Sequence, residues 1–290
     1  MTRQEKAERD EKYSHADLPP VKNHLAFHYR AFMKLFFIGL IGLGSMVLAV
    51  LVFPWIKVFV HPKQKFQTAA RAFVSRTFAF SLFLMRITGV VKVYAPQKEQ
   101  LRSLHSKVIA ANHCSMLDFV VLMSLIPNAN CIVQESYGKT PLAGVIRQAY
   151  ILNSVDFTLL KTMCKETLDM GNNVIIFPEG TRTPRHGKVS YKKGAARIAR
   201  FAGCGIQPVL IAGSDKYGLG KHDPFWSFNH VEPLIYDIQL LPQIQMEQFS
   251  GYSDIASAKK ITDQIHSEIL SAAEKYREHH PLCKTVNHVQ

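Results

Sequence analysis

Two blocks of polar residues, each placed directly after a short apolar run, carry the side chains that could do chemistry. The first block, 112–118, follows the apolar run Val108–Ala111. If His113 precedes a helix with Ser115 as its N-cap and Asp118 three residues further on, the Asp118 carboxylate can accept the proton of one imidazole nitrogen. The other nitrogen is then a general base near neutral pH. The spacing therefore predicts a dyad of His113 and Asp118 that activates a hydroxyl group.

The spacing of the dyad is weak evidence by itself, because the chain has 13 histidines. The plain alternative makes His113 a hydrogen-bonded turn residue and Asp118 a charge at a helix start. Cys114 adds a chemical alternative, since a thiol beside a histidine can act as a nucleophile. Adjacent side chains point in different directions, so we rank this covalent route well below the dyad.

The second block is Phe177-Pro178-Glu179-Gly180-Thr181-Arg182, at the end of the apolar run Val174–Phe177. Pro178 and Gly180 favour a tight turn, and the guanidinium of Arg182 suits a phosphate or a carboxylate. We therefore expect this loop to bind an anion. The chain then carries only basic charges as far as Arg200, most of which we expect to give nonspecific attraction. These basic residues are Arg182, Arg185, Lys188, Lys192, Lys193, Arg197 and Arg200.

The two blocks, in this order, resemble motifs of the 1-acyl-sn-glycerol-3-phosphate acyltransferases, a family of glycerolipid acyltransferases. Residues 112–118 are similar to the family's NHxxxxD block, and residues 177–183 are similar to its FPEGT-R block. Tyr191–Gly194 looks like the lysine–glycine step that follows, and Ile206–Leu210 looks like the last apolar block. The resemblance covers roughly residues 85 to 235. It implies a single α/β acyltransferase domain with a mixed central sheet flanked by helices, preceded by an N-terminal membrane helix.

The resemblance also implies a reaction. His113 would take the proton from an acceptor hydroxyl as that oxygen attacks an acyl thioester, and Asp118 would orient the imidazole. The donor would be acyl-CoA or acyl-ACP, in which the acyl carrier protein holds the chain, and the acceptor a lysophospholipid such as 1-acylglycerol-3-phosphate, in phospholipid biosynthesis. It implies no bound cofactor, no metal and no nucleic acid. The residues expected to contact substrates are Asn112, Glu179, Gly180, Thr181, Arg182 and Lys193.

One block departs from the family pattern. Many members place an arginine for the acceptor's phosphate at the end of a short strand that follows a glycine. Here Gly144 is followed by Ala149–Ser154 without such an arginine, and Arg147 lies too early to replace it. The acceptor is therefore open to a lyso-lipid with another headgroup, or to a hydroxylated acyl chain or pigment.

The elements that must position these blocks follow from the pattern of apolar runs. Short β-like runs alternate with helical stretches, which is typical of an α/β domain. We expect helices after Asp156 as far as Gly171, over Ala195–Ala202, and over Ala256–Tyr276. The expected strands are Val91–Tyr94, Val108–Ala111, Cys131–Val133, Tyr150–Leu152, Val174–Phe177 and Ile206–Ala212.

The segment from Leu35 to Ile56 carries no charge and, as a helix, is long enough to cross a bilayer of about 30 Å. Basic residues are nearly balanced on its two sides, so a spanning helix and a segment that returns to the same leaflet both stay open. We divide the chain into a polar, weakly ordered arm (1–34), this membrane segment (35–56), an interfacial amphipathic region (57–90) and the α/β domain (91–280). The tail after Pro281 is also expected to be weakly ordered.

The net charge and the cysteine spacing limit the classes of binding partner that we expect. The formal net charge of +13 predicts an anionic partner, and the five scattered cysteines show no zinc-ligand spacing. The expected partners are membrane lipids, acyl-CoA or acyl carrier protein, and a lyso-lipid acceptor. We expect the catalytic face on the cytoplasmic side of the cell's inner or plasma membrane. A catalytically silent, membrane-anchored protein that binds anionic lipids is the alternative from another class, and nucleic-acid binding is a weaker one.

Overall fold

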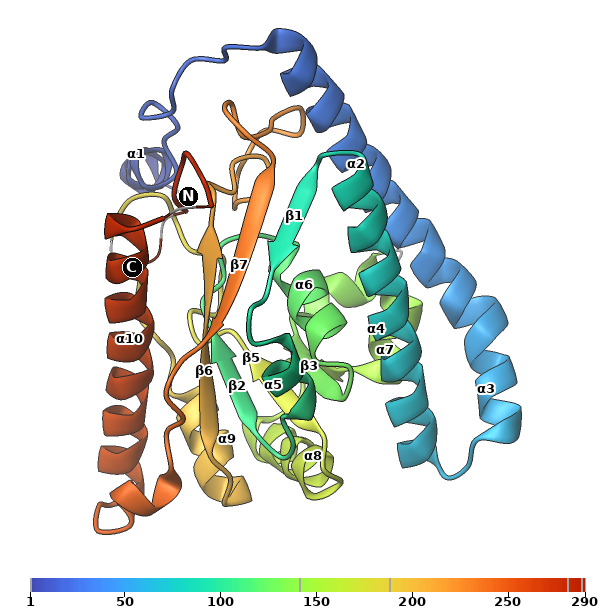
Figure 1. Cartoon of the computed structure of the whole chain (residues 1–290). Coiled ribbons are helices and arrows are strands. Elements are labelled where there is room, and N and C mark those ends of the chain that lie inside the picture. Colours follow the sequence, from blue (N-terminus) through green and yellow to red (C-terminus); the bar gives the residue numbers. More distant parts are fainter. Residues whose placement is uncertain (1, 141, 188, 281, 288, 290) are drawn as a thin grey trace.

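The computed structural model describes residues 2–140, 142–187, 189–280, 282–287 and 289, and its centre is a mixed β-sheet (Figure 1). Within these residues the sheet has seven strands in the order β1-β7-β6-β2-β5-β3-β4. All neighbouring pairs are parallel except β6 and β7, which are antiparallel. The mixed α/β architecture is as expected. The strands are β1 Val91–Tyr94, β2 Val108–Ala111, β3 Ala129–Val133, β4 Ile151–Leu152, β5 Asn173–Ile176, β6 Ile206–Gly213 and β7 Leu234–Leu240.

Strand β7 is the element that the sequence analysis missed. Its residues are interrupted by Asp237 and follow a long loop rich in proline and glycine, so they do not stand out as a strand. β7 pairs with β6 in antiparallel orientation and lies close to Gly213 at the end of β6. Gly213 has a φ of +114°, and a Cβ there would lie 2.0 Å from the Ile235 carbonyl oxygen. The pairing therefore requires a glycine at this position. Pairing across the chain, rather than local pattern, therefore creates this strand.

Helices cover both faces of the sheet, and alternate strand residues enter two separate cores. Ile109 and Val209 face the core formed with α2, α4, α6 and α7. Val108 and Leu210 face the core formed with α8, α9 and α10. The helices of the domain are α5 Lys98–Ser103, α6 Asp118–Leu125, α7 Ala143–Ala149, α8 Phe157–Asp169, α9 Gly194–Ala202 and α10 Asp254–Glu278, with short 3₁₀ turns η2 Glu135–Lys139 and η3 Met246–Phe249.

Several predicted helix ends are confirmed. The Asp156 side chain accepts a hydrogen bond from the Thr158 amide and caps α8. Gly203, which ends α9, adopts the left-handed conformation with φ of +66° that a glycine reaches without strain.

The N-terminal helices form a hairpin against the domain. Helix α2 (His24–Val47), a π-helical turn η1 (Leu48–Val52) and α3 (Phe53–Phe59) make one continuous helical path, and α4 (Lys63–Ile87) returns beside it (Figure 1). The apolar helix thus extends beyond the expected 35–56 at both ends, and His24–Phe59 is long and apolar enough to cross a membrane. The buried Lys34 ammonium donates to the carbonyl oxygens of Gly218, Phe225 and Ser227, which fixes α2 to the domain.

Both chain termini differ from the expectation of weak order. The arm forms helix α1 (Arg3–Lys12), capped by Thr2, and residues after it contact the domain. In the tail, the buried Asn287 donates to the carbonyl oxygen of Ile211 in β6. The residues that contact the arm and the tail are distant from them in the sequence. The polar composition of the two terminal segments therefore did not indicate these contacts.

Candidate active site

The two polar blocks meet because they follow neighbouring strands. The first follows β2 and the second follows β5, and these strands pair in parallel, so their carboxyl ends lie at the same edge of the sheet. The backbone N–H of Thr183 donates to the His113 carbonyl oxygen at 2.5 Å, which joins the loops directly. The sheet topology therefore assembles the predicted site.

The predicted dyad is formed. His113 Nδ1 lies 3.0 Å from Asp118 Oδ2, and the imidazole stacks on the Phe177 ring at 4.2 Å between centroids. Asp118 is fully buried, while the His113 side chain is 20% exposed. In the described part of the chain no hydrogen bond to His113 Nε2 is formed. This nitrogen is therefore available to a substrate hydroxyl.

The helix after His113 starts later than the capping pattern predicts. Helix α6 begins at Asp118, and Ser115 lies in the turn before it. The Asp118 carboxylate accepts from the Ser115 backbone N–H at 2.7 Å and from the Ser115 hydroxyl at 2.5 Å. The Ser115 hydroxyl is also 2.7 Å from the buried Tyr236 hydroxyl, whose pKa burial raises well above its usual value. Three hydrogen bonds, including the one from His113, thus orient one carboxylate.

Glu179, in the second block, faces the loop that carries His113. Its Oε1 accepts from the His113 backbone N–H at 2.8 Å, and its Oε2 lies 2.8 Å from the Thr183 hydroxyl. The Thr183 hydroxyl is in turn 3.0 Å from the His113 carbonyl oxygen. Burial raises the pKa of Glu179 to about 8. A protonated Glu179 can donate to Thr183, which then donates to His113, so every member of the ring finds a partner.

Asn112 and Cys114 are held inside the protein. Asn112 is fully buried, donates to the Ile211 carbonyl oxygen and accepts from the Ile211 amide, which ties the end of β2 to β6. Burial raises the pKa of the Cys114 thiol, and the Asn287 amide donates to its sulfur from the tail. A thiol in this environment is a poor nucleophile at neutral pH. Direct contact of Asn112 with substrate stays a prediction.

Basic side chains at and after the second block contact the loop between β6 and β7. The region around Arg182, Arg185 and Lys221 is here called the entrance of the site. Arg182 Nη1 donates to the carbonyl oxygens of Leu219 and Gly220, and Lys221 Nζ donates to the Thr181 hydroxyl. Gly180 has a φ of +65°, and a Cβ there would lie 2.6 Å from Lys192 Nζ. Lys193, at the start of α9, is exposed.

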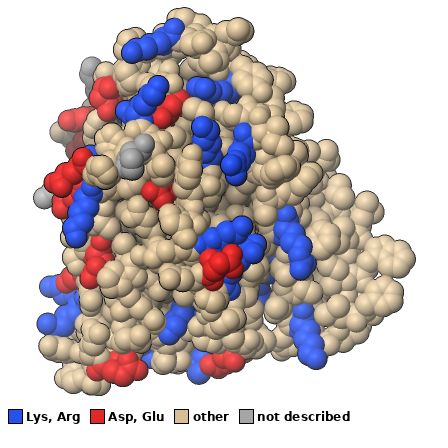
Figure 2. All heavy atoms as spheres, viewed as in Figure 1, with Lys and Arg blue, Asp and Glu red and all other residues tan. Residues whose placement is uncertain are grey.

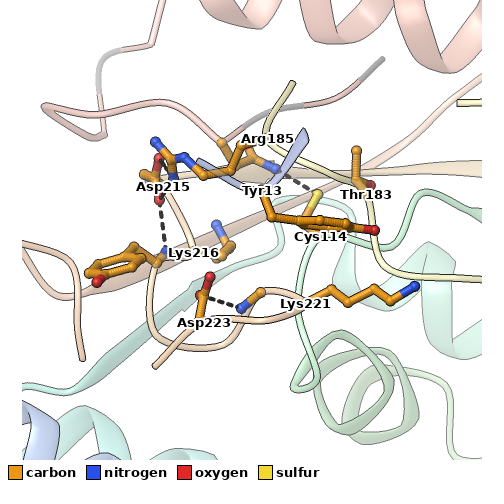
Figure 3. Close-up of a pocket in the computed structure, with 11 residues that line it drawn as sticks. Tyr13, Cys114, Thr183, Arg185, Asp215, Lys216, Lys221 and Asp223 are labelled. Atoms are coloured by element: carbon orange, nitrogen blue, oxygen red, sulfur yellow. Dashed lines mark hydrogen bonds and ion pairs between the residues drawn. The ribbon is translucent and has the colours of Figure 1, made fainter. Parts of the chain in front are cut away.

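A pocket at this entrance includes residues that the sequence analysis did not identify (Figure 3). Arg185 binds Asp215 at 2.8 Å, and Tyr13 reaches into the pocket from the N-terminal arm. Lys221 and Asp223 come from the loop between β6 and β7, which has no motif of its own. Only the fold brings these residues to the site, and the basic run from Arg182 onward was the single sequence signal near them.

The strand without the family arginine is β4. Arg147 donates to the Gly138 carbonyl oxygen, and whether it contacts the acceptor stays a prediction. The fully buried Arg71 of α4 donates to the Ala149 carbonyl oxygen just before β4. Among the described residues no cluster of histidine, cysteine and acidic side chains could hold a metal ion.

A histidine held by a buried carboxylate at the carboxyl edge of a parallel sheet, beside a basic loop, defines the class: an α/β domain of the acyltransferase type. The family model described as Acyltransferase matches residues 92–212. The 1-acyl-sn-glycerol-3-phosphate acyltransferase of Helicobacter pylori is 34% identical over 38% of this chain and 50% of its own length. The lyso-ornithine lipid O-acyltransferase of Pseudomonas aeruginosa is 30% identical over 50% of this chain and 54% of its own length.

The chain thus matches about half the length of these two relatives. The fold is also similar to the crystal structure of the 1-acyl-sn-glycerophosphate acyltransferase from Thermotoga maritima, with a TM-score of 0.58 and 20% identity, covering 86% of this chain and 98% of that one. Residues 92–212 thus form an acyltransferase domain, and the chain is similar to the 1-acyl-sn-glycerol-3-phosphate acyltransferases.

Proposed function

We propose that this protein transfers a fatty acyl group from a thioester donor, acyl-CoA or acyl-ACP, to the hydroxyl of a lyso-lipid at a membrane surface. The observation that carries the proposal is the dyad. Asp118 is buried and holds His113 Nδ1, while the imidazole is 20% exposed and its Nε2 makes no hydrogen bond among the described residues. This is the arrangement that a general base for a hydroxyl requires.

The reaction needs one proton acceptor and no covalent enzyme intermediate. His113 Nε2 takes the proton of the acceptor hydroxyl while its oxygen attacks the thioester carbonyl carbon. The resulting tetrahedral intermediate expels the thiolate by breaking the C–S bond, and the thiolate takes the proton from His113. The Asp118 carboxylate stabilises the imidazolium between these two steps.

The acceptor's headgroup would lie at the entrance, near Arg182, Arg185 and Lys221. Free donor groups of Arg182 and the ammonium of Lys221 favour an anionic group, as in 1-acylglycerol-3-phosphate, and Lys193 lies exposed nearby for the donor's phosphates.

One observation favours a second candidate acceptor. A relative acts, by its name, on a lyso-ornithine lipid, and β4 here lacks the family arginine. The same chemistry on an acceptor without a phosphate is therefore the alternative.

The helical hairpin supports membrane binding without a complete span. Its outward side exposes Phe36, Leu51, Trp55, Phe59 and other large apolar side chains, and Figure 2 shows few charges over that flank. Along the same path, Lys34 binds the domain and Ala49 lies against Gly144 of α7. A perpendicular span would draw the polar domain into hydrocarbon, so we propose that the hairpin lies in one leaflet. The cytosolic origin of the donors favours the cytoplasmic leaflet.

The test is acyl transfer by the purified full chain in mixed micelles. Labelled acyl-CoA and acyl-ACP are offered with a panel of lyso-lipids with and without a headgroup phosphate. We expect His113→Ala to lower kcat by at least about 100-fold, as loss of a general base does. His105→Ala removes the same side chain at an exposed position just before the amino end of β2, opposite the edge of the sheet that carries the site, and should match the wild type. A wild type that transfers to no acceptor, yet binds anionic vesicles, would favour the silent lipid-binding protein.

A further inference from the structure

Residues 12–19, here called the strap, run from the end of α1 across the entrance of the site. Two loops of the domain bind its backbone. His186, in the basic loop after Arg182, donates its backbone N–H to the Lys12 carbonyl oxygen at 3.1 Å and places its Nε2 3.1 Å from the Ser14 carbonyl oxygen. His230 Nδ1 lies 2.7 Å from the Pro19 carbonyl oxygen. The strap is therefore bound to the domain near both of its own ends.

An acidic side chain of the strap binds a cation of the pocket. Asp17 Oδ2 lies 3.0 Å from Arg185 Nη2, while Arg185 Nη1 binds Asp215 at 2.8 Å. Arg185 lines the same pocket as Thr183 and Lys221. The Asp17 carboxylate thus occupies a guanidinium that an anionic headgroup would otherwise reach.

An aromatic side chain of the strap covers the second cation. The Tyr13 ring lies 5.7 Å from Lys221 Nζ and packs edge-on against the His222 ring at 4.7 Å. Figure 3 shows Tyr13 within the pocket together with Arg185, Thr183 and Lys221. Next to it, His15 Nε2 lies 2.8 Å from Asp223 Oδ1.

The space that remains under the strap is too small for a lipid headgroup. The cavity measures about 30 Å³, and one water already needs about 10–15 Å³ of such volume. Sites for small ligands usually measure about 300–1,000 Å³. An acceptor whose headgroup binds Arg185 and Lys221 must therefore displace Tyr13 and Asp17.

We propose that the strap is a gate, in which Asp17 and Tyr13 compete with the acceptor's anionic headgroup for Arg185 and Lys221. The inference rests on the proposed function for its ligand and adds a regulatory element to that site. If the open form is a minor fraction of the molecules, the apparent affinity for the acceptor equals the affinity of the open form multiplied by that fraction. Weakening the gate then lowers KM for the acceptor and leaves kcat unchanged.

The kinetic test uses two variants of the strap that differ in charge. Asp17→Asn removes one partly exposed ion pair, which corresponds to about a two- to fivefold decrease in KM for the acceptor. Tyr13→Ala removes the cover without changing the charge and should also lower KM. Asp169→Asn is the matched control, because it removes an exposed ion pair with Lys165 within α8. Unchanged or raised KM in both strap variants overturns the proposal.

A second measurement does not depend on turnover. Hydrogen exchange of the strap amides is followed in the full-length wild type with and without sn-glycerol 3-phosphate. A competing gate predicts faster exchange at residues 13–18 when this compound is present. Unchanged or slower exchange overturns the gate. Faster exchange in a protein that transfers no acyl group supports the gate and rejects the proposed acyl transfer, so the two failures are distinguishable.

Discussion

At the residue scale, Glu179 holds the loop that carries His113. Its carboxyl group accepts from the His113 backbone N–H and contacts Thr183, and burial raises its pKa to about 8. We expect Glu179→Gln to retain activity, because an amide can accept from His113 and donate to Thr183. Glu179→Ala leaves a buried N–H without this partner and displaces His113, with a loss of kcat/KM on the order of 100-fold per ångström of displacement. Steady-state kinetics of both variants checks this.

The same residue predicts a dependence of stability on pH. Between the usual pKa of 4.5 and about 8, the folded protein holds a proton on Glu179 that the unfolded chain has released. The free energy of unfolding therefore falls as pH rises through this window. Glu179→Gln removes this dependence, so its Tm relative to wild type should rise from about pH 5 to about pH 8. A difference in Tm that is constant with pH would contradict a neutral Glu179.

At the element scale, the antiparallel pairing of β6 and β7 depends on Gly213. Its φ is +114°, and an added Cβ would lie 2.0 Å from the Ile235 carbonyl oxygen. We expect Gly213→Ala to lower the free energy of unfolding by at least about 1–3 kcal/mol, because both backbone strain and a steric contact oppose it. Denaturant unfolding measures the change.

Gly251→Ala is the control for this substitution. Gly251 lies just after η3, and an added Cβ would meet no atom within 4 Å. Its free energy of unfolding should stay close to that of the wild type. Equal effects of the two substitutions would show that close packing at Gly213 does not limit the β6–β7 pairing.

At the scale of the whole molecule, membrane binding should depend on the exposed side of the hairpin. Leu51 is 59% exposed at the π-helical turn. Leu51→Glu replaces an apolar side chain that would enter the acyl layer, so partition onto phospholipid vesicles should fall by at least about tenfold. Vesicle sedimentation measures it. Leu159→Glu is the matched control, since Leu159 on α8 is 51% exposed away from the hairpin, and an equal loss there would argue against this binding surface.

The sequence by itself identified the residues of the candidate site and much of its local frame. His113, Asp118, Glu179 and Arg182 follow apolar runs that became the parallel pair β2 and β5. Asp156 and Gly203 mark helix ends through bonds and dihedral angles that involve only nearby residues. Such features are readable because their energies come from contacts within a few positions of the chain.

The tertiary structure alone decided what joins these parts. Only the fold placed Glu179 behind His113, ran the hairpin along the domain through Lys34, and paired β7 with β6. It also brought the strap to the entrance, where Asp17 meets Arg185 at a separation of 168 residues. Such contacts leave no local periodicity, because their energy arises only when distant segments pack together and water leaves the space between them.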